Sequence, residues 1–267
     1  MAQKIFKLTK TFFEERQMVK NIMKGFKREE FKPHFQFIVD AKTKKIASAE
    51  ALSRWESIKN GLTAPGKYIG IMEKNGLISK HDFYMFEMVC RQLEEWNNTE
   101  FSDIMISCNF TRITLSETNF AQRVKEISDK YTFDRSLLCI EIIEDVLEDN
   151  INYAISNIES CKKLGFTIAL DDLGSGCATI ANLCDYPIDI VKIDREILIK
   201  ANDERGKAIF RGIVEFAHKL NLKTVCEGVE TEEQNQFVIE SNCDYIQGFY
   251  YYKPSSKEEV ERILNTK

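Results

Sequence analysis

The chain has 267 residues, of which 43% are hydrophobic and 30% are charged. This balance predicts a soluble globular protein with a large core and excludes extensive disorder. With 37 Lys and Arg against 42 Asp and Glu, the net charge of −5 argues against general binding to duplex nucleic acid, which requires a basic surface. A small anionic ligand is compatible with this charge, because a local site can differ in sign from the whole chain.

The cysteines form neither a C-x-x-C motif nor a cluster with histidine, so neither a zinc site nor a disulfide framework is predicted. They are Cys90, Cys108, Cys139, Cys161, Cys177, Cys184, Cys226 and Cys243. Most lie among apolar residues, which indicates reduced, buried thiols. No stretch predicts a membrane helix or a secretory signal. We expect a cytoplasmic location, with membrane tethering only through regions outside this chain.

In chain order, the first predicted element is a helix over residues 4–30 with an apolar stripe. The stripe is formed by Phe12, Phe13, Val19, Ile22, Met23 and Phe26. Its basic residues are compatible with a membrane-surface or calmodulin-target helix, but the interspersed glutamates favour a linker helix packed on the body. We therefore predict an N-terminal helical extension or linker over residues 1–29 and one domain over residues 30–267.

From residue 31 onward, short β-rich runs alternate with helical stretches. The predicted strands cover residues 35–39, 45–51, 104–109, 137–143, 167–170, 188–193, 223–226 and 245–249. The predicted helices cover residues 83–95, 120–130, 151–163, 206–219, 232–240 and a last segment from residue 256. Strands joined by crossover helices form a mostly parallel sheet, and a spacing of about thirty residues in the later units favours a closed (β/α) barrel over an open sheet.

Polar residues gather where these strands end. They are Glu50, Asn109, Glu141, Glu144, Asp171, Asp172, Lys192, Asp194, Glu227, Glu230 and Gln247. In a parallel barrel the carboxyl ends of the strands meet on one face, where active sites are built. So many carboxylates at short range need a cationic partner, and oxygen ligands favour Mg²⁺ or Mn²⁺ over zinc. Two such ions would suit an in-line phosphoryl displacement.

Within this set, Lys192 and Asp194 are two residues apart, so on a strand their side chains point to the same side. The lysine would hold a nucleophilic water or stabilise developing charge, and the aspartate would keep it protonated and oriented. Each residue also has a structural interpretation: a charge at a helix N-terminus, a turn cap or a structural ion pair. Their coincidence at successive strand ends favours an active site.

The segment Glu50-Ala51-Leu52 resembles the signature that gives its name to the EAL domain family, the bacterial phosphodiesterases that open cyclic di-GMP. Further motifs follow in the family's order: Asn109 in Cys-Asn-Phe, Glu141-Ile-Ile-Glu144, Asp171-Asp172-Leu-Gly-Ser-Gly, Val191-Lys192-Ile-Asp194, Glu227-Gly-Val-Glu230-Thr231, and Gln247-Gly248 ahead of Lys253-Pro254. The resemblance runs from about residue 30 to the C-terminus. It implies an α/β fold, a modified TIM-like (β/α)8 barrel whose first strand is antiparallel to the others.

The resemblance also implies roles for individual residues. It implies two divalent cations, Mg²⁺ or Mn²⁺. The ligands of the first cation would be Glu50, Asn109, Glu141 and Asp171, and those of the second would be Asp171, Asp172 and Glu227. Lys192 matches the residue that contacts the nucleophilic water, and Glu227 is alternatively the general base. Substrate contacts or groups supporting them are implied for Gln36, the main chain at Leu52, Arg54, Asp194, Glu230 and Gln247. Glu144 matches a residue that steadies the loop after Asp172, a loop also linked to dimerisation.

The chain departs from the family pattern mainly in that loop, at Leu173, Ser175, Cys177, Ala178 and Thr179. Phe37 and Gly70 replace two usual prolines. All implied metal ligands are present, so we interpret these differences as tuning of the activity rather than its loss.

Three hypotheses follow for the function. The first is metal-dependent hydrolysis of cyclic di-GMP to linear pGpG by a homodimer, with an upstream sensory or GGDEF-type domain outside this chain. The second, suggested by the altered loop, is a sensor that binds cyclic di-GMP without cutting it. The third is a barrel lyase that uses Lys192 as a Schiff base. It is less favoured, because the surrounding carboxylates oppose an uncharged lysine.

Overall fold

The fold is known from a computed structural model, which describes the backbone of residues 2–57, 61–143, 151–173 and 186–266. Side chains are described for the same residues except 2–13, 151 and 152. Helix α1 (Ala2–Lys27) precedes a long hairpin of β1 (Phe31–Asp40) and β2 (Ile46–Ser57), and β3 (Gly61–Thr63) extends that hairpin. The remaining strands are β4 (Met105–Phe110), β5 (Leu138–Ile143), β6 (Thr167–Leu173), β7 (Ile190–Ile193), β8 (Lys223–Cys226) and β9 (Tyr245–Gln247).

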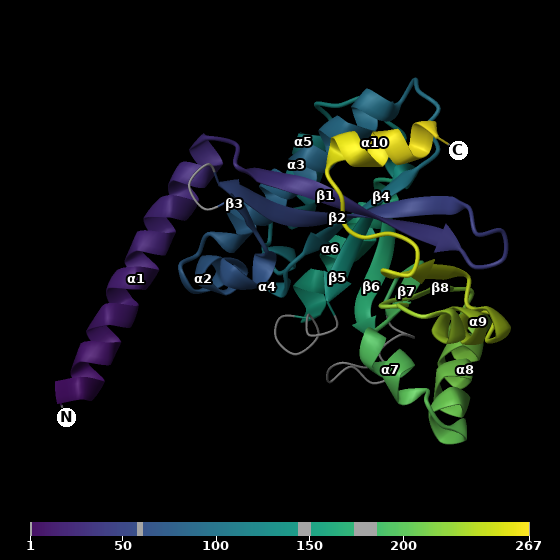
Figure 1. Cartoon of the computed structure of the whole chain (residues 1–267). Helices are drawn as coiled ribbons and strands as arrows, with labels where there is room; N and C mark the ends of the chain where they lie inside the picture. The colour runs from purple at the N-terminus through teal and green to yellow at the C-terminus, as the bar shows by residue number, and fades with distance from the viewer. Residues whose placement is uncertain (1, 58–60, 144–150, 174–185, 267) are drawn as a thin grey trace.

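Helices follow most strands and cover the outside of the sheet (Figure 1). They are α2 (Ile69–Lys74), α3 (Ile78–Trp96), α4 (Arg112–Leu115), α5 (Phe120–Ser128), α6 (Ile151–Lys163), α7 (Arg195–Lys200), α8 (Glu204–Lys219), α9 (Glu232–Glu240) and α10 (Lys257–Asn265). Several begin at residues that cap them: the Asp203 side chain accepts from Gly206 N at α8, and Thr231 and Gln234 form a capping box at α9.

The sheet closes into a barrel. Its strands follow the order β1-β9-β8-β7-β6-β5-β4-β2, and the additional pairing of β1 with β2 closes the ring, with β3 added at the edge of β2. Strand β1 is antiparallel to both of its neighbours, whereas the pairs from β2 round to β9 are parallel. This confirms the predicted TIM-like (β/α)8 barrel with one antiparallel strand. All eight predicted strands are present, and short β3 was not predicted.

Alternation along the strands separates the outside of the barrel from its lumen. Outward-facing side chains such as Phe35, Phe37 and Ala49 belong to the main hydrophobic core beneath the helices. Phe37, in place of a usual proline, is 1% exposed and packs edge-on against Tyr252. Inward-facing side chains form two layers.

We call the layer at the carboxyl ends of the parallel strands the upper lumen; it consists of Gln36, Glu50, Asn109, Glu141, Asp171, Lys192, Glu227 and Gln247. The layer beneath it, the lower lumen, consists of Ile38, Ser48, Ser107, Cys139, Ala169, Ile190, Val225 and Tyr245. Each strand contributes one residue to each layer, or one just beyond its end, and these two residues are two positions apart in the sequence. The same backbone ladder therefore fixes the positions of both.

Helix α1 extends away from the barrel (Figure 1). Near its C-terminal end, Ile22 and Phe26 are buried against Phe31, Trp55 and Tyr68. This contact agrees with the predicted helix that packs on the body, while Phe12 and Phe13 lie outside the residues whose side chains are described. The boundary predicted at residue 29 stays a prediction.

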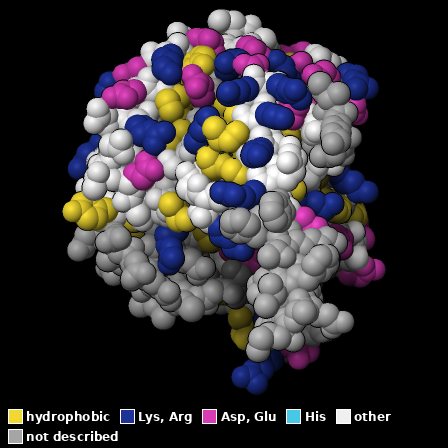
Figure 2. Space-filling model, turned by 90° about the vertical axis from the view of Figure 1, so that its left-hand side faces the viewer, with side chains coloured by type: hydrophobic (Ala, Val, Ile, Leu, Met, Phe, Trp, Pro, Cys, Tyr) yellow, Lys and Arg dark blue, Asp and Glu magenta, His cyan; other side chains and the backbone are white. Residues whose placement is uncertain are grey.

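Three expectations from the sequence concern membrane spanning, surface charge and the cysteines. Within the described ranges, no helix has both the length and the apolar character needed to span a bilayer. On the face shown in Figure 2, basic side chains lie among acidic, apolar and neutral ones. Six of the predicted buried thiols are described, and all six are free and buried; Cys177 and Cys184 lie outside the described residues.

Candidate active site

The upper lumen brings together residues from all sides of the barrel. In the strand register, Gln36 lies opposite Glu50, and Asn109 lies opposite Glu141. Asp171 lies at the end of β6, next to Ile143 at the end of β5. Of the residues predicted at the strand ends, the structure places four carboxylates around the amine of Lys192: Glu50, Glu141, Asp171 and Glu227.

Lys192 is the centre of the site. Its side chain is 1% exposed, and its Nζ lies 3.3 Å from Glu50 Oε2, 3.0 Å from Glu141 Oε2, 3.0 Å from Asp171 Oδ1 and 2.7 Å from Glu227 Oε1. Burial disfavours the ammonium, but the four carboxylates outweigh burial and raise the pKa of Lys192 well above its usual range. The lysine is therefore a charged ammonium, which removes the uncharged amine that a Schiff-base lyase needs.

Amide side chains hold Glu50 in place. Asn109 Nδ2 donates to Glu50 Oε1 at 2.7 Å, and Gln247 Nε2 donates to Glu50 Oε2 at 2.7 Å. Gln247 Nε2 also lies 3.3 Å from Gln36 Oε1, and Gln36 Nε2 donates to the main-chain carbonyl of Tyr252 at 3.0 Å. A chain of amides from β1 and β9 thus fixes one carboxylate of the cluster.

One ammonium does not balance this much negative charge. Burial disfavours the Glu50 carboxylate, but Lys192, Gln247 and Asn109 outweigh it and lower the pKa of Glu50. Burial, reinforced by the charge of Glu50, raises the pKa of Glu141 well above its usual range. Burial likewise raises the pKa of Glu227 to about 8, although Lys192 opposes the shift. Carboxylates forced together without enough cation take up protons instead of remaining ionised.

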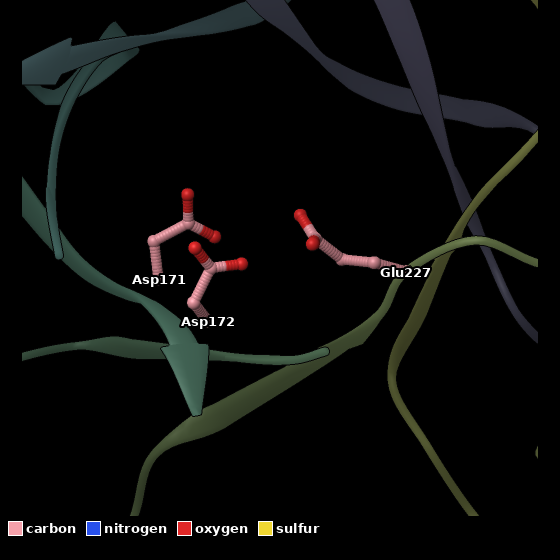
Figure 3. A group of neighbouring side chains, drawn as sticks. All are labelled: Asp171, Asp172 and Glu227. Atoms are coloured by element: carbon pink, nitrogen blue, oxygen red, sulfur yellow. The ribbon is translucent and has the colours of Figure 1, made fainter. Parts of the chain in front are cut away.

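Asp171, Asp172 and Glu227 form an acidic group in which ligand oxygens lie within 4.8 Å of one another. Figure 3 shows the three carboxylates pointing toward one another, the two aspartates from β6 and Glu227 from just beyond β8. Consecutive strand residues normally face opposite sides, but Asp172 has a left-handed backbone with φ of 58°, and the β6–β7 register shifts between Leu170 and Leu173. This local irregularity turns both aspartates toward the site.

The residues fit a divalent cation. All the clustered acidic ligands are oxygens, and burial together with Asp171 raises the pKa of Asp172 to about 6. Asp171 Oδ1 is buried and receives no hydrogen bond of good geometry, although it lies at ion-pair distance from Lys192. A buried carboxylate oxygen without a hydrogen bond, amid excess negative charge, is the environment that a hard cation stabilises.

Beside the acidic group, a pocket of about 300 Å³ opens. Its walls include the predicted residues Gln36, Leu52, Glu230 and Gln247 together with Glu50, Asp171 and Glu227. Arg195 also lines it and donates to Glu230 Oε2 at 2.8 Å. Arg195 was not predicted, and its only signal in the sequence is its place directly after the strand-end residue Asp194.

Gly228 allows this part of the pocket to form. Its φ is 66°, and a Cβ there would lie 2.5 Å from Arg195 Cγ. Only a residue without a side chain leaves room for the arginine beside the pocket. Phe249, 54% exposed, also lines the pocket and was not predicted; its only signal in the sequence is an aromatic residue directly after the Gln247-Gly248 motif.

Two of the predicted site residues, Asp194 and Arg54, do not line the pocket. The Asp194 side chain accepts from Glu196 N at 2.7 Å and caps α7, and among the ion pairs of the described residues none joins it to Lys192. The four carboxylates, rather than Asp194, hold the lysine. Arg54 Nη1 donates to the carbonyl of Ser53 at 2.8 Å and does not line the 300 Å³ pocket. Its contact with substrate stays a prediction.

Part of the predicted site lies outside the described residues. These positions are Glu144 and, in the loop with unusual composition, Ser175, Cys177, Ala178 and Thr179. Leu173 is described and is 4% exposed, at the end of β6.

Comparisons with known proteins find relatives that align with most of this chain. Signaling protein YkoW of Bacillus subtilis is 28% identical over 244 residues, which cover 91% of this chain and 30% of that protein. Cyclic di-GMP phosphodiesterase NbdA of Pseudomonas aeruginosa is 29% identical over 252 residues, covering 94% of this chain and 32% of that protein. The solved structure of PaMucR phosphodiesterase in complex with c-di-GMP matches with a TM-score of 0.86 at 29% identity, covering 91% of this chain and 99% of that chain.

This chain therefore spans about a third of the length of these curated relatives. The sequence profile of the EAL domain matches residues 19–254, from the last turns of α1 to the segment after β9. The chain belongs to the EAL domain family.

Proposed function

We propose that the chain hydrolyses one phosphodiester bond of cyclic di-GMP and yields linear pGpG, using two divalent cations, Mg²⁺ or Mn²⁺. The observation that carries this proposal is the cluster of four buried or half-buried carboxylates that share a single ammonium, Lys192, at the carboxyl ends of the barrel strands. Family membership supports it, as does the similarity to a relative named as a cyclic di-GMP phosphodiesterase.

The first cation would be held by Glu50, Asn109, Glu141 and Asp171, and the second by Asp171, Asp172 and Glu227. Asn109 is suited to this role because its Nδ2 is occupied by Glu50, which leaves the amide oxygen available as a ligand. When bound, divalent cations supply Lewis-acid activation of water and offset the charge of the phosphodiester.

The residues of the chain then position the reactants. Lys192 donates to Glu50 and Glu141, so it holds two carboxylates in fixed orientations, and its charge can orient a nucleophilic water. Glu227 remains either a cation ligand or the base that accepts the proton of that water. The pocket beside the cluster would offer the substrate Gln36, Arg195, Glu230, Gln247 and the main chain at Leu52. Arg54 and Asp194, which do not line it, would be further substrate or supporting groups.

The decisive experiment incubates the chain with cyclic di-GMP and Mn²⁺ or Mg²⁺ and follows pGpG by chromatography. We expect product with the wild-type chain and none when the metal is chelated. The Glu204→Gln variant, which changes a glutamate that is 87% exposed at the surface, should form product like the wild type. No product over a range of metals and pH values would refute the enzyme. Tight binding of intact cyclic di-GMP without product would instead support the sensor alternative.

The expected homodimer, cytoplasmic location and upstream sensory or GGDEF-type domain belong to the same proposal. Similarity to segments of longer relatives supports the last of these.

A further inference from the structure

The lower lumen contains a cavity. It has a volume of about 240 Å³ and lies beneath the upper lumen, with Glu141 and Lys192 forming its inner wall and Asp189, Lys223 and Thr167 at its mouth. It opens at the amino-terminal ends of the parallel strands, the end of the barrel opposite the candidate active site. Barrel lumens of this type are normally filled by layers of branched side chains, so the space requires an explanation.

Small side chains leave this space open. Where a packed layer would carry valine, isoleucine or leucine, β4 contributes Ser107, β5 contributes Cys139 and β6 contributes Ala169, each 3% exposed or less. The larger residues of the layer, such as Ile190 and Val225, come from the next strands round the barrel, β7 and β8. An apolar cavity of about 150 Å³ already accommodates benzene, so 240 Å³ is enough for a bicyclic aromatic molecule.

The charges around the cavity are already paired. Lys192 donates to Glu141 at 3.0 Å in the inner wall, Lys162 donates to Asp189 at 2.7 Å, and Lys223 donates to Asp244 at 2.9 Å. A charged ligand would therefore find no unpaired counter-charge among the described lining residues. An uncharged ligand would contact mainly aliphatic and sulfur-containing side chains and the ring of Tyr245.

Among the described residues that line the cavity, Ser107 carries a buried hydroxyl group without a hydrogen-bond partner of good geometry. Its side chain lies close enough to Glu141 to act toward a lower pKa of that carboxyl, although no hydrogen bond of good geometry joins the two. A buried hydroxyl without a partner lowers the stability of the folded protein, and a hydrogen bond from a ligand N–H or O–H would offset that cost.

We infer that the lower lumen is a binding site for a small, uncharged bicyclic aromatic molecule whose single N–H or O–H group hydrogen-bonds to Ser107. This site is distinct from the pocket of the upper lumen and does not depend on the proposed hydrolysis. Its occupant would lie directly beneath the side chains of Lys192 and Glu141, so the two sites share a wall.

Indole is the test probe, and indene, which lacks the N–H, is its matched comparison. Titration of the full chain, followed by ligand-observed NMR and calorimetry, should show saturable one-to-one binding of indole. Ala169→Leu fills the lumen from β6 and should weaken binding at least tenfold, whereas Ala64→Leu, at an exposed position outside the barrel, should leave it unchanged.

Ser107→Ala tests the hydrogen bond and keeps the inference testable should Ala169→Leu fail to fold. A net hydrogen bond of about 1 kcal/mol corresponds to about fivefold in affinity, so indole should bind about fivefold more weakly while indene is unaffected. The inference is overturned if indole shows no saturable binding up to its solubility limit. It is equally overturned if the Ser107→Ala and folded Ala169→Leu variants bind indole like the wild type. Turnover of cyclic di-GMP is measured separately, so failure here leaves the proposed activity standing.

Discussion

The upper and lower lumen lie on the same eight strands, two residues apart, yet they differ in almost every physical property. The upper layer gathers four carboxylates around one ammonium and leaves Asp171 Oδ1 without a hydrogen bond. The lower layer carries no charged side chain, is built partly from small residues, and is incompletely filled. A step of two residues along a strand therefore separates a layer that needs a cation from one that has room for an apolar molecule.

The rim of the lower lumen sharpens the contrast. Asp244 there accepts from Lys223, His218 and Thr224, so its charge is fully compensated by neighbouring donors. Paired charge of this kind stabilises the fold, whereas the surplus charge of the upper lumen destabilises it until a cation binds. Removal of a carboxylate should accordingly have opposite effects on stability in the two regions.

The largest effect is expected for Lys192→Met. The substitution leaves Glu50, Glu141, Asp171 and Glu227 without their shared ammonium. Loss of one partner from a buried ion pair typically costs about 3–5 kcal/mol, which should lower the melting temperature of the metal-free protein by on the order of 10 °C. Turnover should also fall below detection. Thermal melting with and without Mn²⁺ measures the first effect, and added Mn²⁺ should raise the variant's melting temperature more than the wild type's.

Lys207→Met is the control for Lys192→Met. Lys207 forms a surface pair with Glu204 at 3.1 Å, so its loss should cost less than about 0.5 kcal/mol. If the two variants melt at the same temperature, Lys192 does not stabilise the four carboxylates of the upper lumen.

Glu227→Gln should separate activity from stability. The substitution keeps the shape of the side chain and removes a carboxyl whose pKa burial raises to about 8, so the metal-free protein should melt at the same temperature as the wild type or higher. Turnover should fall by about 10²–10³-fold, because a cation ligand or the general base is lost. A variant that loses stability and activity together would show that Glu227 mainly supports the fold.

Much of this arrangement follows from the sequence. Period-two alternation and strand-end position place Glu50, Glu141, Asp171 and Lys192 on one face, and the structure confirms that they meet there. The antiparallel direction of β1 was available only from the family resemblance, because the strand order is a long-range property that local patterns do not encode.

Two features escape a sequence-based prediction for physical reasons. Asp194 was expected to orient Lys192 because alternation was extended past the end of β7; the chain turns into α7 there, and the aspartate caps the helix. The cavity of the lower lumen depends on which small side chains of different strands lie at the same level. That is fixed by the register of the closed barrel and is visible only in three dimensions.

Gln247→Leu should have a smaller effect and distinguish two roles predicted for this residue. The variant keeps the volume of the side chain but removes the donor to Glu50 Oε2. If Gln247 orients a cation ligand, the Mn²⁺ concentration that gives half-maximal turnover should rise, and turnover should fall about 10–100-fold. If it contacts the substrate instead, KM for cyclic di-GMP should rise at unchanged metal dependence. Gln236→Leu, at an exposed position on α9, is the control.

The smallest effect is expected at the rim, for Asp244→Asn. Partial burial disfavours the Asp244 carboxylate, but hydrogen bonds from Lys223, His218 and Thr224 outweigh it and lower the pKa from 3.8 to about 2. A carboxyl whose pKa is lower in the folded than in the unfolded state adds stability above the unfolded value, and this contribution is lost as the pH falls through the folded one. With the side chain 18% exposed, the contribution after screening is about 1–2 kcal/mol.

Urea unfolding at pH 7 should show that loss in Asp244→Asn, and the difference from wild type should shrink as the pH falls from about 4 toward 2. A difference that stays constant over this range would mean that Asp244 acts through its shape and hydrogen bonds rather than its charge, and the electrostatic contrast between the rim and the upper lumen would fail.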